Sequence, residues 1–339
     1  MQIKTLLTFL RWPHALTQLR LARDLDPFLR LHFLYAASEL GLLAELHKEP
    51  ASPSALAKRI KAARPDFLAL LLELGVATGE LAMHAGRYSL RGQRARALGQ
   101  PSGDALVALV QECIAYHGSV YRHLAERIKG APLGDYLADK GALIARSSRT
   151  LEPLMQNFVT DTVARRRPAR LLEIGCGSGV YLKYAATAYP PLRGMGIDLD
   201  QSVVQQARNN LVAWGIAERF TVMPADIRHA PEALAGPFDF ISLYNNLYYF
   251  TPEERPALFR QLHSRLAPGG TFAVVSLMRG KSAMTINFDL VLRSTVGCAA
   301  LPAPEETMAQ LKAAGFTAIE PVPLMPAADF HGILARRQG

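Results

Sequence analysis

Short apolar runs alternate with amphipathic stretches along the second half of the chain. From Leu171 onward this pattern predicts strands at 170–175, 193–198, 219–224, 238–243, 271–278, 318–324 and 328–336. It predicts helices between them, near 178–188, 201–214, 252–266 and 304–315. Strands that are apolar throughout and separated by helices are typical of a parallel sheet covered on both faces. Only Met325-Pro326-Ala327 separates the last two strands, which is too short for a crossover helix, so we expect these strands to pair antiparallel.

The first hundred residues instead carry the period of several helices followed by a hairpin. Helices are expected at 28–46, 55–62 and 65–74. Residues 81–90 then alternate around a turn at Ala85-Gly86, which is typical of a β-hairpin. Three helices followed by a hairpin predict a winged-helix domain.

A third segment lies between these two regions. Residues 104–163 are helical in period, with breaks near Gly130-Ala131-Pro132 and Gly134. Pro168 follows a run of three arginines and disfavours helix in the residue before it, so a boundary is expected there. The chain therefore divides into a winged-helix-like domain, a helical connecting layer and an α/β domain, at 1–100, 101–167 and 168–339.

Composition places the chain among globular proteins. Its 339 residues are 50% hydrophobic and 20% charged, which is enough to bury a large core in about two domains. No apolar run approaches the roughly 20 residues that cross a bilayer, and Met1-Gln2-Ile3-Lys4 does not open a secretory signal. Three widely spaced cysteines (Cys113, Cys176 and Cys298) indicate a reducing compartment. We expect a cytoplasmic protein without a membrane span.

The most informative motif is a glycine turn that follows the first strand of the α/β domain. Leu171-Leu172-Glu173-Ile174 leads into Gly175-Cys176-Gly177-Ser178-Gly179, and a helix is expected next. Glycines let the backbone approach a ligand closely, and a helix start offers unpaired N–H groups to it. The dinucleotide fingerprint needs glycine at position 180, which is Val180 here. A nucleotide-like cofactor other than NAD is favoured.

This acid-x-Gly-x-Gly-x-Gly pattern resembles that of the class I S-adenosylmethionine-dependent methyltransferases. The resemblance implies a Rossmann-like sheet of seven strands, mostly parallel with an antiparallel last strand. It also implies S-adenosyl-L-methionine as cofactor and S-adenosyl-L-homocysteine as product. By the same resemblance Asp198 binds the ribose and Asp226 the adenine amino group, while Asp200 caps the next helix. The cofactor-binding residues implied are Glu173, Gly175, Cys176, Gly177, Gly179, Asp198, Leu199, Ala225, Asp226, Ile227 and Tyr244.

Within that class the chain resembles the small-molecule O-methyltransferases that dimerise through an N-terminal winged helix. The segments that carry this resemblance are 244–254 and 266–271. These enzymes have a Leu-His-Asp-Trp stretch whose histidine removes the acceptor's proton, but Leu247-Tyr248-Tyr249-Phe250 stands there. A phenol with a reference pKa of about 10 is a poor base near neutral pH. The family's histidine mechanism therefore does not carry over to Tyr248.

Three ways around the missing histidine remain. His117, in a helical layer that lines the acceptor pocket in the family, is one candidate base. An acceptor that is already nucleophilic, such as the enolisable carbon of a 2-oxo acid, would need none, and close in-line positioning is the third route. Asn245 can orient the acceptor or the cofactor, so the catalytic candidates are His117, Tyr248 and Asn245.

Candidate acceptor-binding residues follow from the same resemblance. They are Tyr116, Tyr121, Tyr249, Asn287 and Arg293. Arg293 can clamp a substrate carboxylate, or it can form a helical ion pair with Asp289 four residues earlier. No histidine or cysteine cluster has the spacing of metal ligands, so no metal is expected.

Charge raises one rival reading, a nucleic-acid-binding regulator. The net charge is +9, and residues 1–170 hold 24 basic and 15 acidic side chains whereas residues 171–339 hold 14 of each. The third helix, 65–74, lacks the Arg, Lys, Asn and Gln side chains that read base edges, which disfavours nucleic acid as a partner. A cofactor-binding scaffold is a third reading, disfavoured by the complete glycine motif. The sequence therefore favours a homodimeric methyltransferase of small molecules, with oxygen ahead of carbon as the acceptor.

Overall fold

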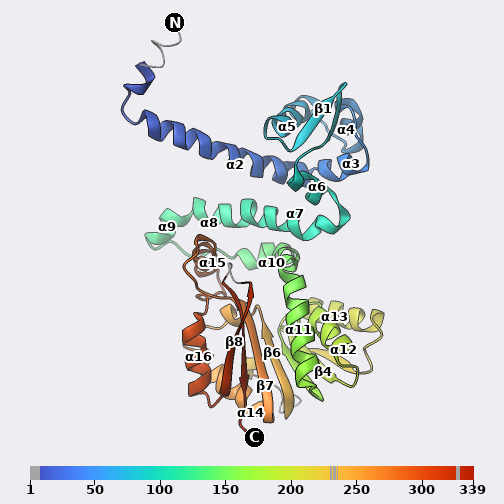
Figure 1. Ribbon diagram of the computed structural model, residues 1–339, viewed down its shortest axis with the longest axis vertical. Helices are drawn as coiled ribbons and strands as arrows, with labels where there is room; N and C mark the ends of the chain where they lie inside the picture. The colour runs from blue at the N-terminus through green and yellow to red at the C-terminus, as the bar shows by residue number, and fades with distance from the viewer. Residues whose placement is uncertain (1–7, 230, 232–233, 235, 326–328) are drawn as a thin grey trace. The chain divides into compact units, whose positions relative to one another are not determined.

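The computed structural model describes residues 8–229, 231, 234, 236–325 and 329–339. The chain forms two compact units, and each is treated by itself (Figure 1). The first comprises Met1–Ala125 and Ala138–Thr150, and the second comprises Glu126–Leu137 and Leu151–Gly339. The predicted start at Met1–Lys4 lies outside the described residues. In the part of the chain that is described, no helix combines the length and the apolar character needed to cross a membrane.

The first unit begins with helices that lead into a hairpin. Its elements are α2 (Ala15–Glu39), α3 (Leu42–Lys48), α4 (Pro53–Arg59), α5 (Pro65–Ala77), β1 (Leu81–His84), β2 (Arg87–Leu90) and α6 (Gln93–Gly99). The hairpin is confirmed: Leu81 pairs with Leu90, and Ala85 and Gly86 form the turn with φ of 47° and 73°. Phe33, Leu42 and Leu72 lie at the centre of this unit's core.

The prediction of one helix over 28–46 is wrong at both ends. Helix α2 begins at Ala15 and passes through Pro27, which removes one backbone hydrogen bond without ending the helix. Helix α2 then stops before Gly41, whose φ of 67° is a left-handed conformation, and α3 begins at Leu42.

Further helices follow the hairpin domain. They are η1 (Pro101–Gly103), α7 (Asp104–Gln111), the π-helical segment η2 (Glu112–His117), α8 (Gly118–Arg122), α9 (Leu124–Ile128), α10 (Tyr136–Ser147) and η3 (Ser148–Leu151). The break predicted near Gly130 and Gly134 is confirmed, since no helix covers residues 129–135. Asp104 accepts hydrogen bonds from Arg146, which joins the start of α7 to the end of α10.

The second unit is built on one seven-stranded sheet. Its strands are β3 (Arg170–Ile174), β4 (Arg193–Asp198), β5 (Phe220–Pro224), β6 (Phe238–Tyr244), β7 (Leu266–Leu277), β8 (Thr317–Met325) and β9 (Phe330–Arg336). The strand order is β5-β4-β3-β6-β7-β9-β8, and β9 runs antiparallel to both of its neighbours. The predicted α/β fold and its antiparallel final pair are confirmed. The short connection predicted between these two strands lies mostly outside the described residues.

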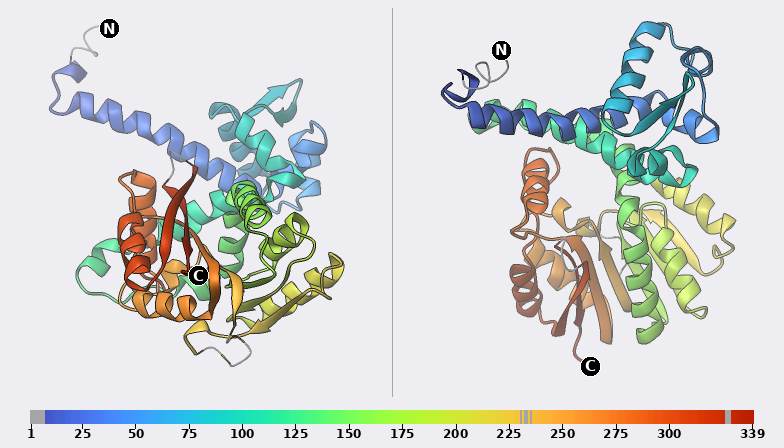
Figure 2. Two further views of the ribbon diagram at one scale, coloured as in Figure 1. Left: turned by 60° about the horizontal axis from the view of Figure 1, so that its bottom comes forward. Right: turned by 45° about the horizontal axis from the view of Figure 1, so that its top comes forward.

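Helices cover both faces of this sheet (Figures 1 and 2). They are α11 (Glu152–Arg166), α12 (Val180–Ala188), α13 (Gln201–Ala213), α14 (Arg255–Arg265) and α16 (Pro304–Ala313). Helix α15 (Ala283–Arg293) follows β7 along the chain. Leu171 packs into the core shared with α11, α12 and α13, whereas Leu172 packs into the core shared with α14 and α16. Successive side chains of a strand point to opposite faces. Because β3, β4, β5 and β6 are parallel, their carboxyl ends meet at one edge.

Candidate functional site

The glycine turn joins β3 to α12 at the carboxyl edge of the sheet. Gly175, Gly177 and Gly179 all have positive φ, at 65°, 53° and 78°, which favours glycine strongly over other residues. The side-chain amide of Asn246 donates to the carbonyls of Ile174 and Gly175 at 3.1 and 3.0 Å. A Cβ on Gly175 would lie 2.2 Å from the Asn246 amide nitrogen. The loop after β6 therefore packs closely against the turn, and a side chain at position 175 would displace the Asn246 amide.

Two neighbouring acids at the end of β4 have different partners. The Asp198 carboxylate accepts from the backbone N–H of Gly177 at 3.0 Å and of Asp200 at 3.2 Å. Asp200 instead caps α13 by accepting from the N–H groups of Ser202 and Val203. The structure thus brings Asp198 to the glycine turn and gives Asp200 the capping role that the sequence predicts.

A buried acidic and aromatic cluster lies directly behind the turn. Glu173 is 1% exposed, and its Oε1 has no hydrogen-bond partner among the described residues. Burial, and to a lesser extent the charge of Asp198, raises the pKa of Glu173 well above its ordinary value. The rings of Tyr181 and Tyr244 meet edge to face with their centroids 5.5 Å apart.

Tyr181 did not emerge from the sequence as a site residue. It lies two residues after Gly179, in the first turn of α12. The signal in the sequence was a long aromatic residue in the first turn of the helix that follows the glycine turn. The sequence could not show where its side chain points, because that depends on where β6 ends. Tyr244, which the sequence did single out, closes β6 beside it and is buried.

Asp226 follows β5 at the same edge of the sheet. Its carboxylate accepts hydrogen bonds from the Arg228 side chain at 3.0 Å and from the Arg228 backbone N–H at 2.9 Å. The adjacent Ala225 N–H donates to the carbonyl of Asp198 at 3.0 Å. Ile227 is buried in the sheet core, whereas the Leu199 side chain is 64% exposed. Arg228 is a further charged group at this position that sequence reasoning missed.

The segment after β6 carries the predicted acceptor-side residues. Asn245 has a left-handed φ of 55°, and its N–H donates to Val275 at 2.7 Å. Such a conformation is uncommon for a residue other than glycine. Tyr248 and Tyr249 form the short 3₁₀ turn η6 (Leu247–Tyr249), and the Tyr248 ring meets Phe288 of α15 edge to face with centroids 5.9 Å apart. Asn287 is the residue just before that partner.

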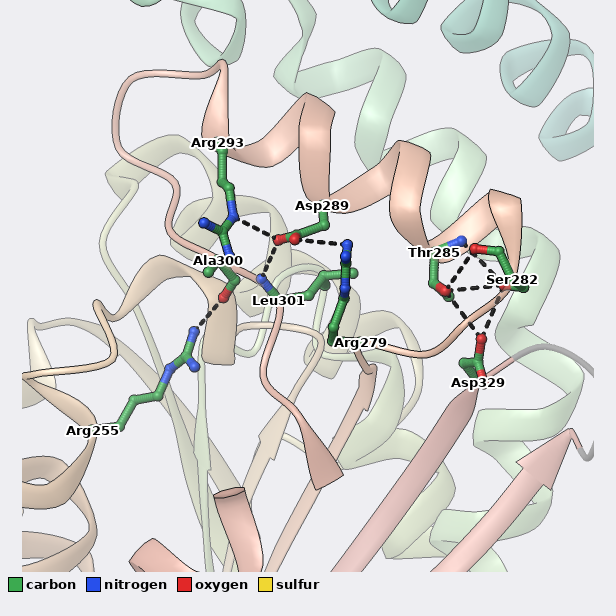
Figure 3. Close-up of polar contacts among 9 residues, drawn as sticks. All are labelled: Arg255, Arg279, Ser282, Thr285, Asp289, Arg293, Ala300, Leu301 and Asp329. Carbon is green, nitrogen blue, oxygen red and sulfur yellow. Dashed lines mark hydrogen bonds and ion pairs between the residues drawn. The ribbon is translucent and has the colours of Figure 1, made fainter. Parts of the chain in front are cut away.

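Buried charges fix the chain that follows α15 (Figure 3). Asp289 is 4% exposed, and it accepts from the side chains of Arg279 and Arg293 and from the N–H of Leu301, at 2.9, 3.1 and 2.8 Å. Of the two roles left open for Arg293, the structure contains the helical ion pair. Arg255 is buried and donates to the carbonyls of Phe250 and Ala300.

The segment that follows α15 is also bonded to Tyr248, the residue that stands where the family has its histidine. The N–H of Ala299 donates to the carbonyl of Tyr248 at 2.8 Å.

A second cluster, in which Ser282 and Thr285 donate to Asp329, anchors the start of α15 (Figure 3). Helix α15 was not among the predicted helices, although Ser282 gives it an ordinary N-cap.

Three predicted site residues belong to the other unit. Tyr116 and His117 end the π-helical segment η2, and Tyr121 follows in α8. The His117 Nε2 lies 3.4 Å from the Glu112 carboxylate, and both side chains are largely buried. A π-helix places residues five apart on one face, and such segments are frequent at functional sites. Tyr116 is buried, whereas Tyr121 is 51% exposed.

Comparison with known proteins identifies the family. A methyltransferase domain matches residues 171–270, and an O-methyltransferase dimerisation domain matches residues 24–96. The chain belongs to the S-adenosylmethionine-dependent O-methyltransferase family. This methyltransferase is 29% identical over 272 residues to the demethylspheroidene O-methyltransferase of Cereibacter sphaeroides, covering 75% of this chain and 69% of that one.

Solved structures share the fold of this methyltransferase. The mitomycin 7-O-methyltransferase superposes with a TM-score of 0.80 at 19% identity, covering 96% of this chain and 98% of that one. The human N-acetylserotonin methyltransferase, solved in complex with S-adenosylmethionine, gives a TM-score of 0.72 at 19% identity, covering 97% and 99%. The predicted family, fold and cofactor are confirmed.

The glycine turn of this methyltransferase is suited to hold S-adenosylmethionine. A Cβ on Gly177 would meet no atom within 4 Å, so the backbone there is open to a ligand. The Asp198 carboxylate accepts from the turn at Gly177, and the buried Oε1 of Glu173 has no hydrogen-bond partner among the described residues. Among the residues that the structure describes, no group of three or more His, Cys, Asp or Glu side chains could hold a metal ion.

Proposed function

We propose that this methyltransferase is a cytoplasmic homodimer that transfers a methyl group to a hydroxyl of a small aromatic or carboxylated molecule. The observation that carries the proposal is the glycine turn held against Asp198, because its three left-handed residues and the adjacent carboxylate form a compact site for a nucleoside. The family favours oxygen over carbon as the acceptor atom. Many acceptor molecules of small-molecule biosynthesis meet this description, and a screen of candidate acceptors distinguishes them.

S-adenosylmethionine supplies a methyl group on a cationic sulfonium, so the protein's tasks are orientation and proton removal. We assign the ribose hydroxyls to Asp198 and the adenine amino group to Asp226. The remaining contacts to the cofactor are assigned to Glu173, Gly175, Cys176, Gly177, Gly179, Leu199, Ala225, Ile227 and Tyr244. Asn245 and Tyr248 orient the acceptor, with Tyr249, Asn287 and Arg293 beside it.

Calorimetric titration of adjacent acid variants tests the cofactor site. Asp198→Ala should weaken S-adenosylmethionine binding by about 1–3 kcal/mol, because two ribose hydroxyls lose their acceptor. Asp200→Ala is the matched control, since its carboxylate caps α13 and accepts no bond from the turn. Unchanged affinity in a folded Asp198→Ala protein would remove this residue from the site. Absence of binding by the parent protein, with NAD as the control ligand, would overturn the proposed function.

We assign removal of the acceptor's proton to His117. The support is the position of its Nε2, 3.4 Å from the Glu112 carboxylate, with both side chains largely buried. Once an acceptor is found among phenols and hydroxylated carboxylic acids, His117→Gln should lower kcat by about 10²–10⁴-fold, because the acceptor loses its general base. Binding of S-adenosylmethionine, measured by calorimetry, should stay unchanged in the same variant. A His117→Gln variant with the parental kcat would refute the assignment.

The dimer is assigned to the winged-helix region and to α2. Leu21, Leu25 and Phe28 are each more than half exposed and repeat every three or four residues along one side of α2. An apolar stripe of this kind needs a partner, and the dimerisation domain begins at residue 24. Leu25→Asp is expected to convert a dimer into a monomer in light scattering, whereas Arg23→Asp, two residues earlier in the sequence, serves as a charge control. A monomeric parent protein would refute the assignment.

A further inference from the structure

The family resemblance places Glu173 in the cofactor site, but it does not say what a buried acid does there. Glu173 occupies the centre of the sheet, opposite Gly196 of β4 and Ser242 of β6, and it is 1% exposed. Its Oε1 accepts no hydrogen bond from any described residue. An ionised carboxylate without a partner is strongly unfavourable in such surroundings, so the free protein holds this side chain as the neutral acid.

Among the described residues, no cationic side chain contributes to the electrostatics of Glu173. Asp198 faces it from β4, Cys176 from the glycine turn, Tyr181 from α12 and Tyr244 from β6. Asp198 is the charged member of this set, and its negative charge opposes ionisation of Glu173. Burial raises the pKa values of the thiol and of both phenols, so these groups are neutral as well. A compensating cation would have to come from outside the protein.

The same surroundings suit a cation from a ligand. The rings of Tyr181 and Tyr244 pack edge to face beside Glu173, and aromatic faces attract positive charge. Glu173 also lies two residues before Gly175, where the turn begins. S-adenosylmethionine carries a sulfonium and an ammonium, whereas S-adenosylhomocysteine carries only the ammonium.

We propose that Glu173 is a proton-linked specificity residue of the cofactor site. It enters the complex as a carboxylate that faces a cationic group of the cofactor, and its proton passes to the solvent as the cofactor binds. The free protein therefore keeps a neutral acid at this position, and the site becomes negative only when a cation is present. This inference rests on the proposed cofactor site and adds that binding releases a proton.

Calorimetry in two buffers of different ionisation enthalpy counts the protons. Below the pKa of Glu173 in the free protein, the parent protein is expected to release up to one proton for each S-adenosylmethionine bound, and affinity should rise by up to about tenfold per pH unit. Glu173→Gln keeps the neutral shape and should bind without this release, with affinity at least tenfold weaker at pH 8. Glu218→Gln, an exposed acid, is the control and should behave as the parent.

A parallel titration with S-adenosylhomocysteine identifies the cation. If a proton is released with both ligands, Glu173 faces the ammonium. If a proton is released with S-adenosylmethionine alone, Glu173 faces the sulfonium. Binding of S-adenosylmethionine by the parent protein without proton release would overturn the inference and leave the methyltransferase assignment standing. Failure of both ligands to bind would instead overturn the proposed function. The proton count uses the unmodified protein, so it decides the question even where Glu173→Gln does not fold.

Discussion

Replacement of Gly175 by alanine tests how the glycine turn is held. Two independent features of the structure oppose a side chain there. The residue has a φ of 65°, and a Cβ would lie 2.2 Å from the amide nitrogen of Asn246. That amide donates to the carbonyls of Ile174 and Gly175, so it cannot move away without leaving both of them.

The expected cost of Gly175→Ala follows from these two features. A left-handed conformation costs an L-residue about 1–2 kcal/mol. Displacement of the Asn246 amide removes two hydrogen bonds, each worth about 0.5–1.5 kcal/mol. Together they lower the free energy of unfolding by about 2–5 kcal/mol. Gly177→Ala is the matched control, because its φ is 53° and its Cβ would meet no atom within 4 Å. It should lose only the first contribution.

Urea unfolding of the two variants measures the difference directly. Gly175→Ala should be less stable than Gly177→Ala by about 1–3 kcal/mol. In the double variant Gly175→Ala/Asn246→Ala the collision is absent, so the second substitution should cost less than it does in the parent protein. Equal stability of the two single variants, or full additivity in the double variant, would show that the Asn246 contact does not restrict position 175.

Three further substitutions probe neighbouring parts of the molecule. Asp200→Ala removes the cap of α13 and should lower the free energy of unfolding in urea by about 0.5–2 kcal/mol; no loss would refute the cap's contribution. Asp289→Asn leaves two arginines without their carboxylate and should speed hydrogen exchange across 294–302, and unchanged exchange would contradict the anchoring role. A hydrogen bond from Arg146 lowers the pKa of Asp104 below 3.8. The pair therefore stabilises the fold above that pH and is lost as pH falls through the folded value. Thermal melts of Asp104→Asn should approach those of the parent on acidification, and a constant gap would refute this.

The strands were predictable because they depend on local information. A run such as Leu171–Ile174 is apolar on both sides, and its boundaries follow from the glycines and the arginine that flank it. The same holds for the hairpin at Leu81–Leu90 and for the cap at Asp200. Helix limits were less predictable. Pro27 is a local signal to stop, and packing of the apolar side of α2 overrides it.

The site divides in the same way. The order of glycines and acids along the chain was sufficient to identify the cofactor and the family, because each sits at a fixed offset from a strand end. The sequence could not place Asn246 against Gly175, or Tyr181 against Tyr244, since these pairs are 71 and 63 residues apart and meet only when β3 and β6 become neighbours. Nor could it show that Glu173 has no partner. Motifs depend on spacing along the chain, whereas the charge and packing around a buried group depend on every element that folds onto it.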